Sequence, residues 1–286
     1  MPRFNLKATL LVVCSAFSAV TAHAADFDNV NDHISLQMYT LRNVGDTENQ
    51  LAMANKAGFS NVELVGNQGL DAPQLIALLD KYSLKVSSSH VQLASLENNF
   101  DETVQFNKAI GNNVVIVPWL APAERPTTAE EWAEFGKKLD KLGAKLKQEN
   151  MTLAYHNHNF EMKKYGKKTA MDIILENAKP SNLSIEFDVA WISRGGQDPA
   201  ELIKKYKNRV YAIHAKDNAA IGVRDNEMNF APLGEGLLDW DTIIPAAKKS
   251  HVKWYIVEHD APIDPYAIIT TSLNNLEEKL ESTSHK

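Results

Sequence analysis

The chain has 286 residues, of which 44% are hydrophobic and 23% charged, and its 36 acidic side chains outnumber the 30 basic ones. This acidic balance argues against nucleic acid as a partner, because contacts of Lys and Arg with phosphates dominate that kind of binding. A chain of this length is typical of one α/β barrel. Its sequence contains no Gly/Ser linker or low-complexity tract that would divide it.

Residues 1–24 carry the three parts of a secretory signal in order. Arg3 and Lys7 form a positive start, residues 8–20 form an apolar run, and residues 22–24 read Ala-His-Ala, an A-x-A cleavage site. The apolar run is too short for a comfortable transmembrane helix. We therefore expect a cleaved signal peptide, a periplasmic location and no stable membrane insertion.

Residues 25–286 are expected to form a single domain. Cys14, the single cysteine, lies inside the signal, and Val13 before it is not the small residue of a lipoprotein signal. The mature domain would then have no disulfide and no thiol chemistry. This suits a periplasmic protein whose large core makes disulfides unnecessary.

Eight segments have the apolar, β-branched pattern of strands, at 34–39, 61–66, 85–91, 113–120, 151–158, 182–188, 209–217 and 252–260. Helical patterns lie between them and after the last, at 46–57, 71–82, 101–110, 128–149, 169–178, 198–206, 239–250 and 265–281. Eight β-then-α units predict a closed parallel (β/α)8 TIM barrel. An open doubly wound sheet is the alternative, but no G-x-G-x-x-G follows the first strand.

Ionisable side chains stand at the ends of four consecutive predicted strands. His156 and His158 end the fifth, Asp188 the sixth, His214 the seventh and Glu258 the eighth. Active sites of such barrels lie at the C-terminal ends of the strands, and residues two apart share a face. Ionisable groups inside a barrel are costly unless they are paired or coordinated. One metal ion would satisfy all four strand ends.

Strand alternation also assigns the neighbours of these groups. Ala154 shares a face with His156, and Val210 and Ala212 share one with His214, so small or apolar residues lie lower on each strand. Lys216 follows on the same face as His214 and is expected to reach the rim of the barrel.

Each of these groups, taken alone, has a structural reading. A buried histidine is usually hydrogen-bonded within the core, and Asp188 could cap a loop. Their conjunction at four strand ends favours a metal site. Glu161 has three readings: it caps the next turn, holds a substrate hydroxyl or replaces His156 as a ligand. Glu186 is expected to support the ligands from behind, and His259 to face away as a structural residue.

The chain resembles the xylose-isomerase-like barrels, which include sugar phosphate isomerases and epimerases. The resemblance spans nearly the whole mature chain, and the order of its motifs is more specific than any one of them. The carriers are "ISLQMYTLR", "AGFSNVELVG", "SSSHVQL", "YHNHNFEM", "IEFDVAWISRGGQDP", "IHAKD", "PLGEGLLDW" and "IVEHD".

This resemblance implies a divalent-metal site whose ligands come in the order Glu, Asp, His, Glu. Asp188, His214 and Glu258 match the last three, whereas an H-N-H run stands where many members have the first glutamate. The run is similar to the branch that includes inosose dehydratases and proteins acting on 3-keto sugars. By that similarity His156 is the fourth ligand and His158 a base beside the substrate, with His158 or Glu161 as alternative ligands.

These groups suit one divalent ion, Mn²⁺ first, with Co²⁺, Zn²⁺ or Mg²⁺ as alternatives, and no soft sulfur is present to favour copper. Such an ion would act as a Lewis acid that stabilises the enediolate of a sugar. His158 is the expected base, and Glu258 would both hold the metal and move a proton. Lys216 and His90 are expected to bind or protonate hydroxyls. Trp191 and Trp119 would form apolar walls, or else pack in the core.

The expected function is therefore that of a sugar isomerase or epimerase. A lyase, dehydratase or hydrolase of 3-keto glycosides is the alternative, and a non-catalytic sugar-binding barrel is a further one. Because sugar phosphates are mostly cytoplasmic, and no clear phosphate-binding glycine loop is present, we expect an unphosphorylated sugar or keto-sugar as substrate. The sequence does not indicate the oligomeric state.

The signal predicts a mature N-terminus at Ala25, because cleavage follows the Ala-His-Ala motif. N-terminal sequencing of the protein purified from the periplasm of a bacterial host measures this directly. A cytoplasmic pool that begins at Met1 would show that the segment does not direct export.

Overall fold

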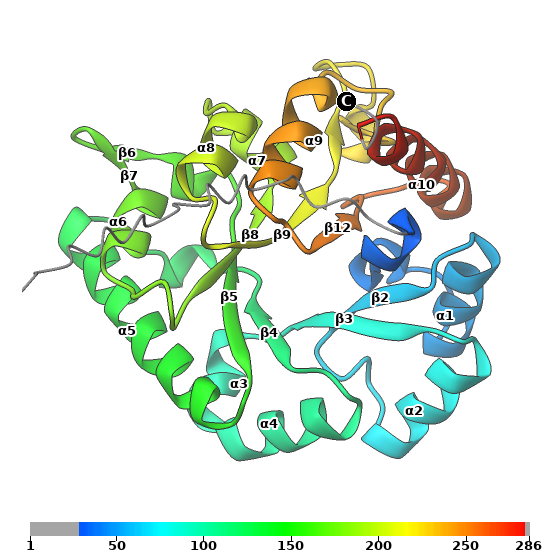
Figure 1. Cartoon of the computed structure of the whole chain (residues 1–286), viewed down its shortest axis with the longest axis horizontal. Helices are drawn as coiled ribbons and strands as arrows, with labels where there is room; N and C mark the ends of the chain where they lie inside the picture. The colour runs from blue at the N-terminus through cyan, green and yellow to red at the C-terminus, as the bar shows by residue number, and fades with distance from the viewer. Residues whose placement is uncertain (1–28, 284–286) are drawn as a thin grey trace, which may run out of the picture.

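Each segment predicted as a strand contains one, and the eight close into a parallel barrel (Figure 1). The computed structural model describes residues 29–283, so the expected signal peptide lies outside the described residues. The strands are β1 (Ile34–Gln37), β2 (Asn61–Val65), β3 (Lys85–His90), β4 (Val114–Val117), β5 (Thr152–His156), β8 (Ser184–Asp188), β9 (Val210–Ala215) and β12 (Trp254–Val257). β1 pairs in parallel with both β12 and β2, which closes the barrel and confirms the predicted fold.

Most of the strands end earlier than the sequence pattern predicts. β5 ends at His156, so His158 lies in the following loop, and β12 ends at Val257, just before Glu258. The residues just after each strand are often polar, and they no longer pair with a neighbouring strand. Their side chains therefore gather where the backbone turns towards the next helix. This shortening places the ionisable groups at the mouth of the barrel.

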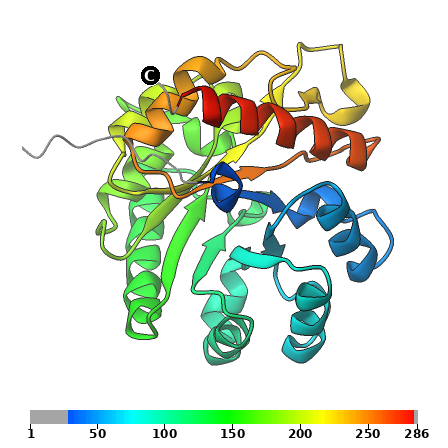
Figure 2. The same ribbon diagram turned by 45° about the vertical axis from the view of Figure 1, so that its right-hand side comes forward.

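Helices ring the strands (Figures 1 and 2). The predicted ones are α1 (Thr47–Lys56), α2 (Ala72–Lys81), α4 (Phe100–Ala109), α5 (Ala129–Gln148), α6 (Ala170–Glu176), α8 (Pro199–Lys205), α9 (Trp240–Lys249) and α10 (Pro265–Ser282). Their starts follow local chemistry: Asp71 and Gln74 form a reciprocal capping box on α2, and Thr128 and Glu131 form another on α5. None of the helices within residues 29–283 is long and apolar enough to cross a membrane.

Short elements that the sequence pattern did not predict lie next to the barrel strands. They are α3 (Leu93–Asn98), α7 (Val189–Arg194), the two-residue strand pairs β6 (Lys164–Tyr165) with β7 (Lys168–Thr169) and β10 (Asp217–Asn218) with β11 (Phe230–Ala231), and five 3₁₀ turns, η1 (Val30–His33), η2 (Met38–Leu41), η3 (Pro122–Glu124), η4 (Phe160–Met162) and η5 (Asp225–Glu227). Most of them follow a barrel strand, so they shape the mouth. The long segment between β9 and α9 is drawn in yellow in Figure 2.

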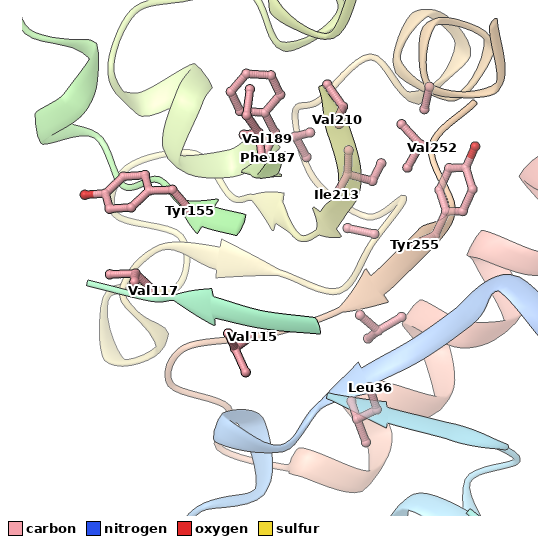
Figure 3. Close-up of a cluster of buried hydrophobic side chains, with 14 of the residues drawn as sticks. Leu36, Val115, Val117, Tyr155, Phe187, Val189, Val210, Ile213, Val252 and Tyr255 are labelled. Atoms are coloured by element: carbon pink, nitrogen blue, oxygen red, sulfur yellow. The ribbon is translucent and has the colours of Figure 1, made fainter. Parts of the chain in front are cut away.

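The hydrophobic core lies between the strands and the helices. Leu36, Val115, Tyr155, Phe187 and Tyr255, each from a different strand, belong to one buried cluster (Figure 3). Inside the barrel the apolar filling is small. The barrel interior therefore has room for polar groups, and the strands supply them.

Two strand pairs depart from a regular register. The pairing of β2 with β3 shifts between Val62 and Glu63. The pairing of β8 with β9 shifts register between Ile185 and Glu186, so that Ile185 faces Val210 and Glu186 faces Ala212. Val210 consequently packs in the outer core (Figure 3), whereas Tyr211 contacts the inner cluster and donates a hydrogen bond to the carbonyl of Ser87. The expectation that Val210 shares a face with His214 is wrong, because this irregularity reverses the alternation.

Close packing of α5 on the segment before β8 gives a test of the fold. A Cβ on Gly143 would lie 1.8 Å from the backbone oxygen of Asn182. Gly143→Ala should therefore lower the free energy of unfolding by about 2 kcal/mol or more. Alanine favours helices, so without the clash the substitution would stabilise the protein. Chemical denaturation checks the sign, with Lys141→Ala, exposed on the same helix, as a control expected to change little.

Candidate active site

A cavity of about 530 Å³ opens at the C-terminal ends of the strands. Its lining combines acids and imidazoles with aromatic side chains: Tyr39, Val65, His90, Gln92, Pro118, Trp119, Arg125, His156, His158, Asn159, Phe160, Trp191, Met228, Glu258 and Asp260. A larger hollow between α3 and α5 contains none of the strand-end groups. Clefts with a few convergent polar groups among aromatic walls are the usual form of a small-molecule site.

The four predicted metal ligands converge beside this cavity. Nδ1 of His214 lies 2.9 Å from Oε2 of Glu258 and 4.0 Å from Oδ2 of Asp188. Nε2 of His156 lies 3.9 Å from the same Asp188 oxygen. All four side chains are buried, and they come from the ends of β5, β8, β9 and β12.

The two carboxylate oxygens of Asp188 have different surroundings. Its Oδ1 accepts a 2.9 Å hydrogen bond from the backbone N–H of Trp191 and thereby caps α7. Its Oδ2 is buried and accepts no hydrogen bond of good geometry, although Nζ of Lys216 lies 2.7 Å away. Burial raises the pKa of Asp188 to about 6. A carboxylate oxygen left in this state is suited to a cation.

Lys216 lies behind the cavity wall. Its ammonium contacts Asp188, Glu258 and Asp260 at 2.7, 2.8 and 2.5 Å, and its side chain is fully buried. Burial acts to lower the pKa of Lys216, but these three carboxylates raise it above its ordinary value. These contacts favour a role for Lys216 as a fixed positive charge. They do not favour the predicted role, in which Lys216 binds or protonates substrate hydroxyls.

A second layer of acids and imidazoles lies beneath the four ligands. Oε1 of Glu186 lies 2.8 Å from Nε2 of His90, 3.0 Å from Nδ1 of His156 and 2.9 Å from Nε2 of His214. One carboxylate therefore faces three imidazoles. Since its contacts occupy one nitrogen of His156 and one of His214, the opposite nitrogen of each ring is left to face Asp188. Carboxylates behind ligating histidines commonly orient them in this way.

Glu63 completes this layer, and the sequence analysis missed it. Its Oε1 lies 2.7 Å from Nε2 of His214 and 3.1 Å from Nε2 of His90, and it accepts a 2.7 Å hydrogen bond from Gln37. Ser88 donates to its other oxygen. The signal was a single acid in the apolar strand "NVELV". His90 thus belongs to the inner layer as well as to the cavity wall.

Charge pairing perturbs the pKa values of this inner layer. Burial opposes ionisation of Glu63, but His90 and His214 hold the pKa of that carboxyl well below its usual range. Burial acts to lower the pKa of His90, yet Glu63 and Glu186 raise it to about 9. Burial lowers the pKa of His156 well below its ordinary value, which keeps that ring neutral. A neutral imidazole is the form that binds a metal.

The residues present fit a divalent ion. Ligand atoms of Asp188, His214 and Glu258 lie within 4.8 Å of one another. The donors are oxygens and imidazole nitrogens, the set that Mn²⁺, Co²⁺, Zn²⁺ and Mg²⁺ accept in various proportions. The carboxylates of Asp188, Glu258 and Asp260 share one lysine, so additional positive charge is favourable here.

His158 lies at the cavity wall rather than in the ligand layer. Its ring packs 5.8 Å from that of Phe160 and 5.4 Å from that of Trp191, measured between centroids. Its Nδ1 is buried without a hydrogen-bond partner. Burial lowers the pKa of His158 to about 3, so the ring is neutral in the resting site.

Glu161 does not reach the cavity. Its two oxygens accept hydrogen bonds from the hydroxyl of Tyr155, at 2.6 Å, and from the backbone N–H of His158, at 2.8 Å. Burial raises its pKa to about 7. Of the three roles considered for Glu161, the geometry favours the cap of the loop. The hydrogen bond from the backbone of His158 then lets Glu161 set the position of that residue.

The remaining predicted residues lie where expected. Trp119 and Trp191 both line the cavity, and Trp119 is 39% exposed, so it is available to a ligand. His259 is buried beneath Phe230, with its backbone N–H donating to Thr40, which fits its structural reading. Asp260 is an addition: it continues the face of Glu258 by one more alternation and binds Lys216.

The "PLGEG" motif forms a loop tied to Asp217. Oδ2 of Asp217 accepts hydrogen bonds from the backbone N–H groups of Gly234 and Gly236 and from the indole of Trp240. A Cβ on Gly236 would lie 2.2 Å from Oδ1 of Asp217, so only glycine allows this approach. Asp217 directly follows Lys216, and the loop therefore helps to fix that lysine.

The fold and the site together define a (β/α)8 barrel with an acid–imidazole centre at its mouth. Residues 51–279 match the model of the Xylose isomerase-like TIM barrel family. The chain belongs to this family.

Curated relatives named inosose dehydratase are similar to the chain. The protein of Lacticaseibacillus casei is 25% identical over 238 residues, which are 71% of this chain and 78% of that protein. The protein of Clostridium tetani is 28% identical over 151 residues, 47% of this chain, and the match spans about half (49%) of its own length.

Solved structures share the fold. A sugar phosphate isomerase/epimerase from Parabacteroides distasonis has a TM-score of 0.70 at 22% identity, with 92% of this chain and 98% of that chain covered. The IOLI protein with a bound zinc atom has a TM-score of 0.68 at 15% identity, with 87% and 98% covered.

The convergence of the ligands predicts that a divalent ion binds and that single substitutions release it. Asp188→Ala and His214→Ala should each lose most of an ion that the wild type holds at about one per chain. Elemental analysis after dialysis measures this. His251→Asn is the control, because His251 is exposed with a φ of 55° that asparagine tolerates. Wild-type metal content in both alanine variants would mean that the strand ends are structural.

Proposed function

We propose that this chain is a divalent-metal-dependent isomerase or epimerase of an unphosphorylated sugar or keto-sugar. The observation that carries the proposal is the convergence of Asp188, His214 and Glu258, with Nε2 of His156 3.9 Å from Asp188, beside a cavity whose wall contains the imidazole of His158. Membership in the Xylose isomerase-like TIM barrel family supports the substrate class.

Proton transfer next to a carbonyl is the chemistry that these groups fit. A bound divalent ion supplies Lewis acidity that acidifies the hydrogen on the carbon beside the carbonyl. His158 accepts that proton: its Nδ1 is buried without a partner and its ring is held between Phe160 and Trp191. Glu161 fixes the loop that carries it.

Glu258 provides a second proton-carrying group. Burial acts to raise its pKa, but Lys216 and His214 hold the pKa well below its usual range, so it is an anion in the resting site. β8 and β9 separate β12 from β5, so Glu258 and His158 approach a ligand from different sides. Epimerisation would need Glu258 to take up a proton from solvent and deliver it on the side opposite His158, whereas return of the proton from His158 to the neighbouring carbon isomerises the sugar. Lys216 holds Glu258 and Asp188 in place for either outcome.

Elimination is the second candidate reaction, and the similarity to inosose dehydratases favours it. The same first proton abstraction would be followed by loss of a group from the next carbon. If that group is a hydroxyl the enzyme is a dehydratase, and if it is the alcohol of a 3-keto glycoside the enzyme releases an aglycone. Product analysis by mass spectrometry distinguishes these outcomes from isomerisation, which leaves the mass unchanged.

We also propose that the protein works in the periplasm with one Mn²⁺ ion. The signal pattern of residues 1–24 supports the location. The hard oxygen and imidazole donors support Mn²⁺, and zinc in the IOLI structure makes Zn²⁺ the first alternative. A periplasmic location favours unphosphorylated substrates.

The two histidines of the H-N-H run should separate metal binding from proton transfer. His158→Gln should keep the ion and lower deuterium exchange into a keto-sugar by about 10²-fold or more, because it removes the base. His156→Gln should lose both, because Nε2 of His156 faces Asp188. Metal analysis and exchange monitored by NMR measure the two properties on the same samples.

His251→Asn again serves as the control. Metal loss in His158→Gln with retention in His156→Gln would reverse the two roles. Full exchange in His158→Gln would assign the proton transfer to Glu258.

A further inference from the structure

The wall of the cavity opposite the acids contains an arginine that the proposed reaction does not use. Arg125 follows η3, in the segment between β4 and α5, and it is the one lysine or arginine among the residues described as lining the cavity. In the barrel order, β4 stands four positions from β12, directly across the mouth. Arg125 therefore faces the side that carries Glu258 and Asp260.

Packing fixes the guanidinium of Arg125. Its Nε donates a 3.0 Å hydrogen bond to the carbonyl of Leu120. Its central carbon lies 3.8 Å from the centre of the Phe160 ring and 5.5 Å from that of the Trp119 ring. Cation–π stacking of this kind orients the plane of the group without consuming its N–H donors.

The guanidinium of Arg125 makes no direct ion pair within the described residues, and the buried carboxylate of Glu161 acts on it only at longer range. Among residues 29–283 no carboxylate lies within 4 Å of the guanidinium nitrogens. The acids nearest in sequence have other partners: Glu124 accepts from the backbone N–H of Ala121, and Glu131 from those of Thr127 and Thr128. A half-buried cation held in place without a direct counter-ion is ready to receive an anion.

Other arginines close to the mouth lack this freedom. Arg194 binds Asn218 and the carbonyls of Met228 and Asn229, and Arg224 pairs with Glu227. Arg42 donates to the carbonyl of Tyr39 and stacks on its ring, outside the cavity lining. Arg125 is thus distinguished by lining the cavity with its two terminal nitrogens uncommitted, since only Nε donates a hydrogen bond to the described residues.

We propose that Arg125 binds a carboxylate at the end of the substrate remote from the reacting carbons, so that the substrate is a sugar acid. This deepens, and rests on, the proposed function. A planar carboxylate matches the paired N–H donors of one guanidinium. A phosphate would bring a charge of about −1.5 to −2 into a mouth that already contains Glu258 and Asp260, with one arginine to receive it. The ring of the sugar would lie against Trp119, which is 39% exposed.

Binding measurements on the mature protein test this inference without turnover. The probes are D-glucuronate, D-glucose and D-glucose 6-phosphate, titrated calorimetrically into the wild type, Arg125→Gln and Arg125→Lys. Wild type should prefer glucuronate to glucose by about tenfold, the order expected of a charge-assisted pair. Arg125→Gln should abolish the preference, because it weakens the binding of glucuronate about tenfold more than that of glucose. Arg125→Lys should restore part of it, because it keeps the charge without the planar donors.

Arg42→Gln is the matched control, since it removes the same charge from the mouth outside the cavity. It should leave the preference for glucuronate intact. Equal or no binding of glucuronate and glucose by wild type would overturn the proposal, as would equal losses in Arg42→Gln and Arg125→Gln. Tighter binding of glucose 6-phosphate than of glucuronate would overturn the assignment to a carboxylate.

The experiments distinguish an error in the role of Arg125 from an error in the proposed reaction. Metal-dependent deuterium exchange into neutral keto-sugars, without any preference for glucuronate, would retain the reaction and reject the role of Arg125. A preference that depends on Arg125, without exchange into any sugar, would retain the binding site and reject the reaction.

Discussion

The need to balance charge inside the barrel governs the arrangement of the site. Glu63, Glu186, Asp188 and Glu258 are buried side by side, and Asp260 stands just above them. Isolated carboxylates in such surroundings would be prohibitively unstable. Lys216 binds three of the five and the imidazoles of His90 and His214 bind the others, so each acid has a cationic or hydrogen-bonding partner. The positions of the strand ends are therefore tied to one another through these contacts.

The sequence predicted the features that depend on local pattern and on the topology of the barrel. The eight strands and their helices follow from local periodicity and capping, as in α2 and α5, where Asp71 and Thr128 stand just before an apolar stripe. The convergence of the four ionisable strand ends follows because barrel topology brings successive strand ends together, so Asp188 and His214 must be neighbours once the fold is known. Local pattern and topology were sufficient for these features.

Other features depend on tertiary contacts that no local pattern encodes. Glu63 reads as an isolated acid in an apolar strand until β2 is placed across the barrel from His214. The reversal at Val210 arises from the fit of β9 against β8, and alternation alone predicts the opposite face. Lys216 was expected at the rim, but three carboxylates draw its ammonium behind the wall. In each case the deciding interaction joins residues far apart in the chain.

The same charge constraint gives a reason for a histidine rather than a glutamate at position 156. Nδ1 of His156 lies 3.0 Å from Oε1 of Glu186. A glutamate there would bring a second carboxylate against Glu186, and two acids this close cannot both remain ionised without a cation between them. A neutral imidazole instead contacts Glu186 through one nitrogen and presents the other towards Asp188. His156 and Glu186 are therefore hydrogen-bonding partners. Substitution of either one alone would leave the other buried without that partner at the floor of the cavity.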